Sequence, residues 1–170
     1  RSLTLSQCNS QYEEGFVGLS QLSALKTLTI NQMEFDDPMD GLFTLDTLEE
    51  LHITHSKFYM PPNEVTVSDN LKVLDLSYTD FITMPGYGEY RYVGYEDEVI
   101  AQSVLQNYFS ATALEELYLD YYLIGDLSGL NNLSNLKVLS LQRCDLTEIA
   151  ETDLSGCTLL EELYLSKNQI

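Results

Sequence analysis

Apolar and polar positions along this chain follow a sequence motif, here called the phrase, which occurs in six full copies. The phrase is a leucine, two residues, a second leucine, one residue, an aliphatic residue, two further residues and a last position that is usually small or polar. Successive copies begin 23, 23, 43, 22 and 24 residues apart, which indicates a repeat protein. A truncated copy opens the chain at Leu3, Leu5 and Cys8, and the full copies begin at Leu25, Leu48, Leu71, Leu114, Leu136 and Leu160.

Within each copy, the two inner apolar positions flank one solvent-facing residue, and this period of two indicates a strand with one buried face. Consecutive strands are therefore expected to form a parallel sheet whose open face displays the residues between the leucines. One repeat buries too little apolar surface to fold alone, so stability must come from stacked neighbours. One leucine of each strand is predicted to lie in register along a hydrophobic spine: Leu28, Leu51, Leu74, Leu117, Leu139 and Leu163.

The phrase resembles that of the leucine-rich repeat superfamily, and the resemblance covers essentially the whole chain. Residues 125–136 are similar to the short repeats of internalin-like proteins, and residues 146–170 to animal extracellular repeats. The resemblance implies an α/β fold, a curved right-handed solenoid with a parallel sheet on its concave face and irregular or helical segments on its convex face. It implies one domain over residues 1–170, with about seven repeats, the first truncated. Because no capping segment is visible, we expect the chain to be part of a longer protein.

The last position of the phrase, here called the ladder position, departs from the family's pattern. The resemblance implies an asparagine that bonds backbone groups of the neighbouring turn, and only Asn168 fits. Met33 and Tyr122 are poor ladder residues, so we expect a partly broken ladder or irregular turns at these two places. Residues that are common lesser choices in the family stand at Cys8, Ser56, Thr79 and Cys144.

The second position of the phrase alternates in charge from strand to strand. Opposite charges on neighbouring strands favour pairing and oppose register slips. We therefore interpret this alternation as structural rather than as a ligand site. The residues are Arg1, Lys26, Glu49, Lys72, Glu115, Lys137 and Glu161.

The repeat that begins at Leu71 is 43 residues long, and its excess forms an insertion over residues 82–113. Glycine and tyrosine dominate residues 84–98, which predicts a surface loop. Helical spacing of apolar residues predicts a helix over about residues 97–110. Tyrosine gives large contact area at low entropy cost, so the loop supplies candidate partner-binding residues, Tyr87, Tyr90, Tyr92 and Tyr95. The alternative is that the tyrosines pack on the solenoid itself. The acidic flanks of Tyr90, Tyr92 and Tyr95 also resemble the context of tyrosine sulfation, which applies only if the chain is secreted.

The open face of the predicted sheet gathers further candidates beside the root of this insertion. Two columns of exposed positions meet there, and aromatic residues with a few charges are typical of interface hot spots. The alternative is that exposed strand positions favour tyrosine for its strand propensity alone. The candidate partner-binding residues are His52, Asp75, Tyr78, Tyr118, Asp120 and Tyr121.

Composition narrows the class of partner. Twenty-seven acidic and eight basic residues give a formal net charge of −19, which opposes binding to nucleic acid or anionic membranes and favours a partner with a basic surface. The chain contains no apolar run long enough to insert into a membrane. The charge further predicts that binding weakens as salt rises.

Catalytic and metal chemistry find little support in the pattern. His52 and His55 should point to opposite faces of one strand unless the strand end bends both outward, so we expect no metal site. No nucleophile with an oriented base can be placed beside His52 and Asp75. Three scattered cysteines, Cys8, Cys144 and Cys157, do not form a disulfide framework or a zinc site. We expect neither a cofactor nor an enzyme.

The sequence therefore predicts a protein-recognition module that binds its partner through the concave face and the tyrosine-rich loop. The alternative is a structural subunit whose repeats pack laterally or self-associate. Asn132, in the triplet Asn-Leu-Ser, is a candidate glycosylation site. We expect an extracellular or cell-surface location, and the cytoplasm stays open as an alternative.

Overall fold

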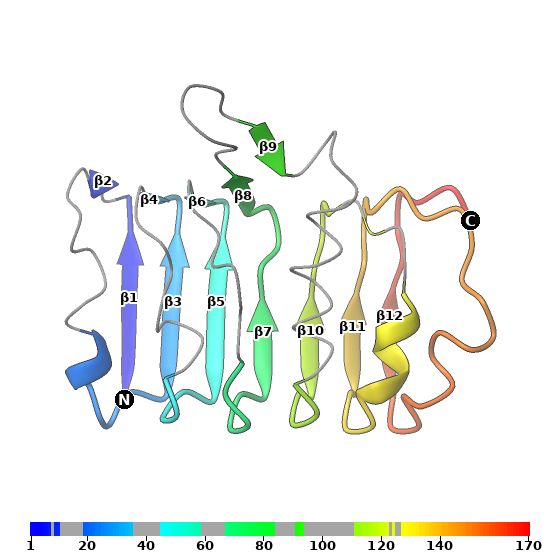
Figure 1. The fold of residues 1–170 in the computed structure, drawn as a ribbon, viewed down its shortest axis with the longest axis horizontal. Coiled ribbons are helices and arrows are strands. Elements are labelled where there is room, and N and C mark those ends of the chain that lie inside the picture. The colour runs from blue at the N-terminus through cyan, green and yellow to red at the C-terminus, as the bar shows by residue number, and fades with distance from the viewer. Residues whose placement is uncertain are drawn as a thin grey trace.

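The computed structural model describes residues 1–7, 9–10, 19–35, 45–58, 67–83, 91–93, 111–122, 124 and 127–170. Its main element is a seven-stranded parallel sheet, one strand from each copy of the phrase (Figure 1). The predicted leucine-rich repeat solenoid is thereby confirmed. In spatial order the strands are β1 (Ser2–Ser6), β3 (Thr27–Asn31), β5 (Glu50–Thr54), β7 (Val73–Asp75), β10 (Glu116–Tyr118), β11 (Val138–Ser140) and β12 (Glu162–Tyr164).

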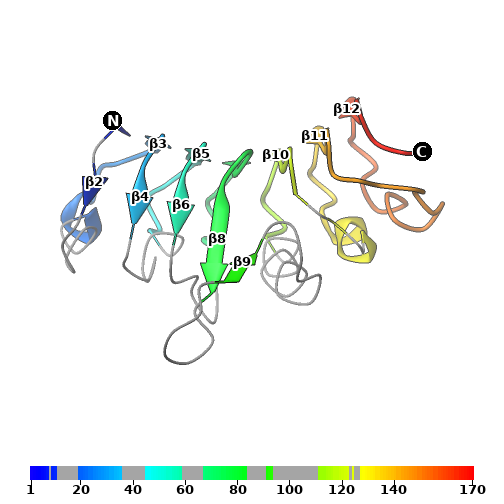
Figure 2. The ribbon, with the colours of Figure 1, turned by 90° about the horizontal axis from the view of Figure 1, so that it is seen from above.

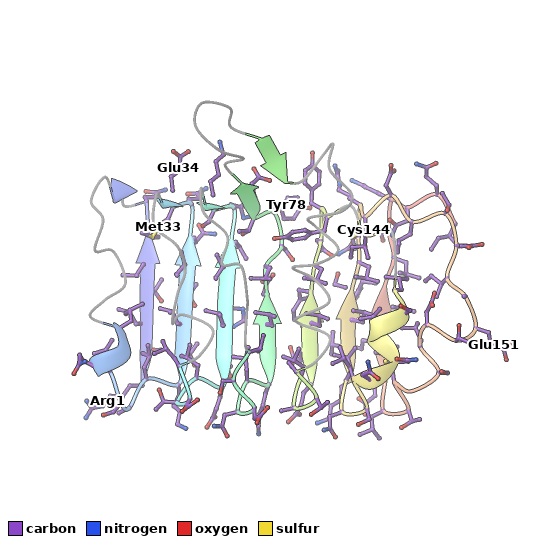
Figure 3. All side chains as sticks on the ribbon, in the orientation of Figure 1. Arg1, Met33, Glu34, Tyr78, Cys144 and Glu151 are labelled. Carbon is purple, nitrogen blue, oxygen red and sulfur yellow. The ribbon has the colours of Figure 1, made fainter. Side chains whose placement is uncertain are left out.

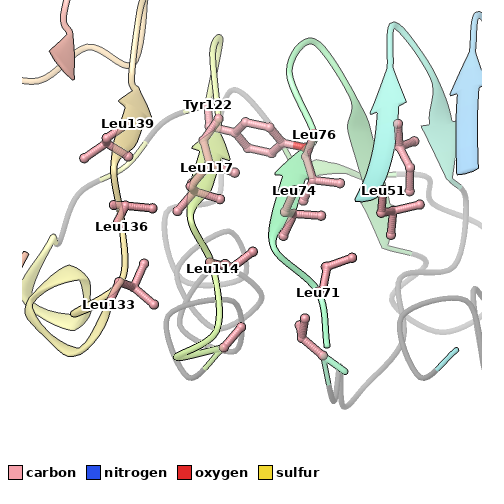
Figure 4. Packing of buried hydrophobic residues seen from close by; sticks show 14 of the residues in the cluster. Leu51, Leu71, Leu74, Leu76, Leu114, Leu117, Tyr122, Leu133, Leu136 and Leu139 are labelled. Atoms are coloured by element: carbon pink, nitrogen blue, oxygen red, sulfur yellow. The ribbon is translucent and has the colours of Figure 1, made fainter. Parts of the chain in front are cut away.

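The leucine spine is in register from the first strand to the last, as predicted. Leu28 pairs with Leu51, and Leu139 pairs with Leu163. Leu74 pairs directly with Leu117, although the insertion lies between them. These leucines are fully buried except in the last strand, and Figure 4 shows several of them pointing into the same layer. Burying a leucine side chain stabilises the fold by about 1.5–3 kcal/mol, so the spine contributes substantially to stability.

A second, five-stranded sheet runs beside the first and was not predicted. Its strands are too short for a period-two pattern to reveal them. They are, in spatial order, β2 (Asn9–Ser10), β4 (Glu34–Phe35), β6 (Lys57–Phe58), β8 (Asp80–Thr83) and β9 (Arg91–Val93).

The last strand of this second sheet, β9, comes from the insertion. It pairs antiparallel with β8, and Ile82 faces Tyr92 in the register. Within the predicted surface loop over 84–98, residues 91–93 form a short strand, because β8 offers an edge with which the returning chain pairs. The predicted helix over residues 97–110 lies outside the described residues.

Seen from above, the row of main-sheet strands curves, and the sheet lines the concave side (Figure 2). Two short 3-10 helices, η1 (Leu19–Gln21) and η2 (Ser128–Asn132), lie on the opposite side. The final coil approaches η2 closely at Gly156, where an added Cβ would lie 1.7 Å from the carbonyl oxygen of Asn131. Only glycine fits at this contact.

The ladder position connects neighbouring coils, most completely at Asn168. Its Oδ1 accepts bonds from the backbone amides of Cys144 at 2.9 Å and Leu146 at 3.2 Å. Its Nδ2 donates to the carbonyl oxygens of Leu141 at 2.6 Å and Leu165 at 2.9 Å. This one side chain therefore ties the last two coils together.

At Met33 the turn is regular, and of the two expected outcomes the broken ladder is the one found, because the buried Met33 side chain takes no part in the ladder hydrogen bonds. Its amide donates to Ser56 Oγ at 3.2 Å, and its carbonyl accepts from the amide of Lys57 at 2.8 Å. The side chains of Met33 and Tyr122 are both buried in the core. Apolar packing thus replaces the polar side-chain contact at these positions.

The charge alternation has the structural role that was predicted. Lys26 Nζ lies 2.7 Å from Glu49 Oε1, and Lys72 Nζ lies 3.6 Å from Glu115. Lys137 also pairs with Glu115, so this carboxylate lies between two ammonium groups. The pairs are exposed, so each adds little stability on its own, but together they favour the observed register.

Candidate functional site

The concave face is built from the residues between the strand leucines. The strand register brings His52 of β5 opposite Asp75 of β7, and Asp75 opposite Tyr118 of β10. These three side chains are partly exposed, because the leucines on either side point into the core. They form the centre of the face, with β3 and β11 on its flanks.

Where each strand ends, the chain turns through a left-handed residue. Backbone φ at these positions lies between 51° and 74°. Left-handed backbone costs a non-glycine residue roughly 1–2 kcal/mol. The geometry is held because the amide of each such residue, up to Arg143, donates to a carbonyl of the next coil, at 2.9–3.3 Å. We call this set the rim column: Gln7, Gln32, His55, Tyr78, Tyr121, Arg143 and Lys167.

The rings of the rim column form a continuous stack. Tyr78 and Tyr121 lie 5.2 Å apart between centroids, with an interplanar angle of 21°. His55 stacks on the other side of Tyr78, at 4.9 Å and 6°. Figure 3 shows Tyr78 at the ends of the strands, and the two tyrosines are each 38% exposed. The stack therefore displays aromatic surface at the edge of the concave face.

His55 was expected in the same exposed column as Tyr78 and Tyr121, but it was not among the predicted partner-binding residues. Strict alternation places His52 and His55 on opposite faces, but alternation stops at Thr54, where β5 ends. The left-handed turn at His55 bends its side chain outward, which is the other alternative that the sequence left open. Its equivalence to Tyr78 and Tyr121 in the repeat was the signal that could have revealed the stack.

Asp75 also governs the charge of His52. Its Oδ2 lies 3.8 Å from His52 Nδ1, and its Oδ1 accepts a bond from the amide of Ser77 at 3.0 Å. The interaction with this carboxylate raises the pKa of His52, against the opposing effect of partial burial; Glu50 and Glu116 add smaller contributions in the same direction. The imidazole is therefore protonated more readily than a free histidine.

Tyr118 is held in place by a carboxylate of its own strand. Its hydroxyl donates to Glu116 Oε2 at 2.8 Å. Burial, and after it the bond to Glu116, raise the pKa of Tyr118, so the hydroxyl stays protonated. Tyr164 and Glu162 repeat the same arrangement on β12.

Asp120, a predicted partner-binding residue, is committed to the neighbouring coil. Its Oδ1 accepts from Ser140 Oγ at 2.6 Å and from the amide of Gln142 at 2.9 Å. Its Oδ2 accepts from Gln142 Nε2 at 3.1 Å. Both carboxylate oxygens thus accept hydrogen bonds from the end of β11 and the turn after it. We therefore assign Asp120 a positioning role at the concave face.

The tyrosines of the insertion are described only in small part. Tyr92 lies on β9, whose backbone extends the second sheet beside β8. Tyr87, Tyr90 and Tyr95 lie outside the described residues. Because β8 begins two residues after Tyr78, the insertion does leave the solenoid next to the ring stack.

The two thiols of the described residues, Cys144 and Cys157, are both buried. Cys144 is buried and donates to the carbonyl of Leu119 at 3.2 Å, and burial raises its pKa to about 12. Burial also raises the pKa of Cys157, which donates to the carbonyl of Leu130.

Within the residues that the structure describes, no group of three histidine, cysteine, aspartate or glutamate side chains could hold a metal ion. In the same ranges, no helix is both long and apolar enough to cross a membrane.

Comparisons with known proteins find similarity in fold. No protein-family model and no curated protein matches the chain. Among solved structures, it is similar to the Arabidopsis receptor kinase HAESA, solved with the peptide hormone IDA and the co-receptor SERK1, at 24% identity and a TM-score of 0.48 over 84% of this chain. The match spans only 26% of the HAESA chain. An internalin (inlF) from Listeria monocytogenes is similar over 99% of this chain and 68% of its own, at 16% identity and a TM-score of 0.39.

Proposed function

We propose that this leucine-rich repeat solenoid is a recognition module that binds a protein partner through its concave face, around His52, Asp75 and Tyr118. The rim column beside them contributes its stacked rings. The observation that supports the proposal most is the exposed stack of Tyr78 and Tyr121, with centroids 5.2 Å apart, at the edge of a rigid sheet. Interface hot spots are enriched in such aromatic anchors.

Preorganisation strengthens the case for binding. The backbone amide of Tyr78 donates a hydrogen bond to the carbonyl oxygen of Asp120 at 3.0 Å, and that of Tyr121 donates one to the carbonyl oxygen of Gln142 at 2.9 Å. Each ring also restricts its neighbour. A partner that docks here therefore orders few groups that were free before, and this lowers the entropic cost of association.

The charge of the concave face indicates the chemistry of the partner. Glu50, Asp75 and Glu116 come from three adjacent strands, and from β3 to β12 the described strand residues that face solvent on this side include no lysine or arginine. A basic surface on the partner complements this face and speeds association through electrostatic steering. The tyrosine-rich insertion, with Tyr87, Tyr90, Tyr92 and Tyr95, extends the same interface in our proposal.

The location that we propose is extracellular or at the cell surface. Asn132, the candidate glycosylation site, is exposed on η2, on the side away from the concave face. A glycan there would leave the proposed binding face open. A mass decrease of the purified protein on enzymatic deglycosylation, absent in Asn132→Gln, supports this location; an unmodified mass removes that support.

Site-specific photo-crosslinking in cells of the source organism tests the binding face. A benzophenone amino acid replaces Tyr118 on the concave face or, as the matched control, the exposed Gln21 on η1, on the opposite side. We expect a discrete heterologous adduct from position 118 and none from position 21. Equal adducts from both positions would contradict the proposal. An adduct of the chain with itself would favour the alternative of a self-associating structural subunit.

A further inference from the structure

Two basic side chains of the rim column lack an acidic partner among the described residues. Arg143 and Lys167 occupy equivalent places on adjacent coils, both in left-handed backbone and both exposed. Neither forms an ion pair or a side-chain hydrogen bond with any described residue. They are adjacent positive charges in a chain of 27 acidic and 8 basic residues.

The other lysines of the solenoid show how unusual this is. Lys26, Lys57, Lys72 and Lys137 each lie beside a glutamate of a neighbouring coil. Arg143 has Tyr121 on one side of it in the rim column and Lys167 on the other, so no acidic residue faces it there. Within the described residues the repeat thus compensates these four lysines, but it leaves Arg143 without an acidic partner next to the ring stack.

We propose that the rim column binds an extended acidic peptide segment of the partner, in which an aromatic side chain packs on Tyr78 and Tyr121 and carboxylates pair with Arg143 and Lys167. The guanidinium of Arg143 suits a bidentate carboxylate contact, and Lys167 adds a second, mobile charge. Because both faces of Tyr78 are covered within the stack, its exposed ring edge is the surface on which an aromatic side chain can pack edge to face. This proposal deepens the proposed function and rests on it only in taking the chain to be a protein-binding module.

The geometry of the rim column suits an extended chain. Adjacent strands lie about 4.8 Å apart, so the four steps from His55 to Lys167 span about 19 Å. An extended peptide advances about 3.3 Å per residue, so roughly six residues cover this length. Each coil contributes one side chain to the line, which matches a ligand that runs across the strands.

The rim column and the concave face then select opposite charges. Glu50, Asp75 and Glu116 attract basic groups toward β5, β7 and β10, whereas Arg143 and Lys167 attract acidic groups toward the rim at β11 and β12. A partner that carries both kinds of group can bind in one orientation only. This arrangement contributes specificity through unfavourable contacts in the reversed orientation.

Selection from a random octapeptide display library against the full chain tests the proposal. A protein of net charge −19 should enrich basic peptides by default, so an acidic preference is diagnostic. We expect a class of enriched peptides with aspartate or glutamate close to an aromatic residue. The double variant Arg143→Gln/Lys167→Gln should lower the affinity of these peptides by about tenfold, measured by fluorescence anisotropy at fixed salt.

The matched control is Lys26→Gln/Lys72→Gln, which removes the same two positive charges from exposed side chains. We expect less than about a twofold change for the acidic peptides with this variant. Enrichment without an acidic class, or an equal loss of affinity in both double variants, would overturn the proposal. Melting curves of both variants verify that the fold is intact.

Failure of the proposed function is read out separately. Crosslinking from position 118 reports on the concave face, whereas peptide binding reports on Arg143 and Lys167. If acidic peptides bind at the rim column while crosslinking from position 118 fails, the concave-face proposal is wrong and the present one stands. If crosslinking succeeds and no acidic class appears, the reverse holds.

Discussion

Tyr78 and Tyr121 are 43 residues apart in sequence, yet their rings stack with centroids 5.2 Å apart. Both residues lie three positions after the end of the strand in their own coil, and the two strands, β7 and β10, are neighbours in the sheet. The insertion between them therefore does not interrupt the stack. Its two ends leave and rejoin the solenoid at adjacent coils, next to this aromatic surface.

Replacing Tyr78 separates the contribution of the ring from that of its strained backbone. Tyr78→Ala removes two stacking contacts and keeps φ near 59°, so we expect a loss of about 1–2 kcal/mol in the free energy of unfolding. Tyr78→Gly loses the same ring but relieves the left-handed backbone, and should be more stable than the alanine variant by about 0.5–1 kcal/mol. Urea titrations measure both values.

The control for this comparison is Gln32, which has the same backbone geometry without a ring stack. Gln32→Ala should cost less than Tyr78→Ala, and Gln32→Gly should again exceed its alanine counterpart. An alanine variant of Tyr78 as stable as the parent would show that the stack adds nothing to folding. Its role would then be confined to binding.

The pair of His52 and Asp75 predicts how stability depends on pH. The pKa of His52 is raised in the folded state, so its contribution is fully present below the unfolded pKa of about 6.5 and is lost as pH rises through the folded pKa. We expect the urea midpoint to fall between pH 6 and pH 8. Asp75→Asn should remove most of this dependence, since asparagine keeps an acceptor for the amide of Ser77 but has no charge.

Two glutamates set the acidic limit of the pH range in which the protein is most stable. Their lysine partners hold the pKa values of Glu49 and Glu115 below 4.5, so this contribution is present above that value and is lost as pH falls through the folded pKa. Stability should therefore be highest roughly between pH 5 and 6.5.

An Asp75→Asn variant whose midpoint follows the parent at every pH would contradict the assignment to His52.

A methyl group at Gly156 should destabilise the last coils. The added Cβ would lie 1.7 Å from the Asn131 carbonyl oxygen, which is backbone and cannot move without displacing η2. We expect Gly156→Ala to cost about 1–3 kcal/mol, as overpacked sites do. Thr158→Ala, at an exposed position nearby, is the control and should fall within about 0.5 kcal/mol of the parent. Comparable melting curves for the two variants would contradict the close approach.

The buried thiols of Cys144 and Cys157 should be inert in the folded protein. Burial raises the pKa of both, to about 12 for Cys144, so little reactive thiolate forms at neutral pH. In a Cys8→Ser background, a disulfide reagent such as dithionitrobenzoate should react with two thiols in urea and slowly with either in buffer. Fast labelling in buffer would show that these coils open locally.

The sequence alone was sufficient to predict the spine and the central pairs. Period-two leucines at a fixed spacing determine which positions face each other, so the contact of Asp75 with Tyr118 followed from counting. The left-handed turn that carries His55 into the stack could not be predicted in this way, because alternation ends where β5 ends. The role of Asp120 also escaped, since its hydrogen bonds depend on the turn of the next coil.

The direct pairing of Leu74 with Leu117 has a consequence for how this molecule can diversify. The hydrophobic interior closes across the insertion as if no extra residues were there. Residues can therefore be gained or lost between those two coils without altering the side chains that keep the protein folded. Such a junction lets selection remodel the recognition surface by length as well as by composition, at little risk to the core.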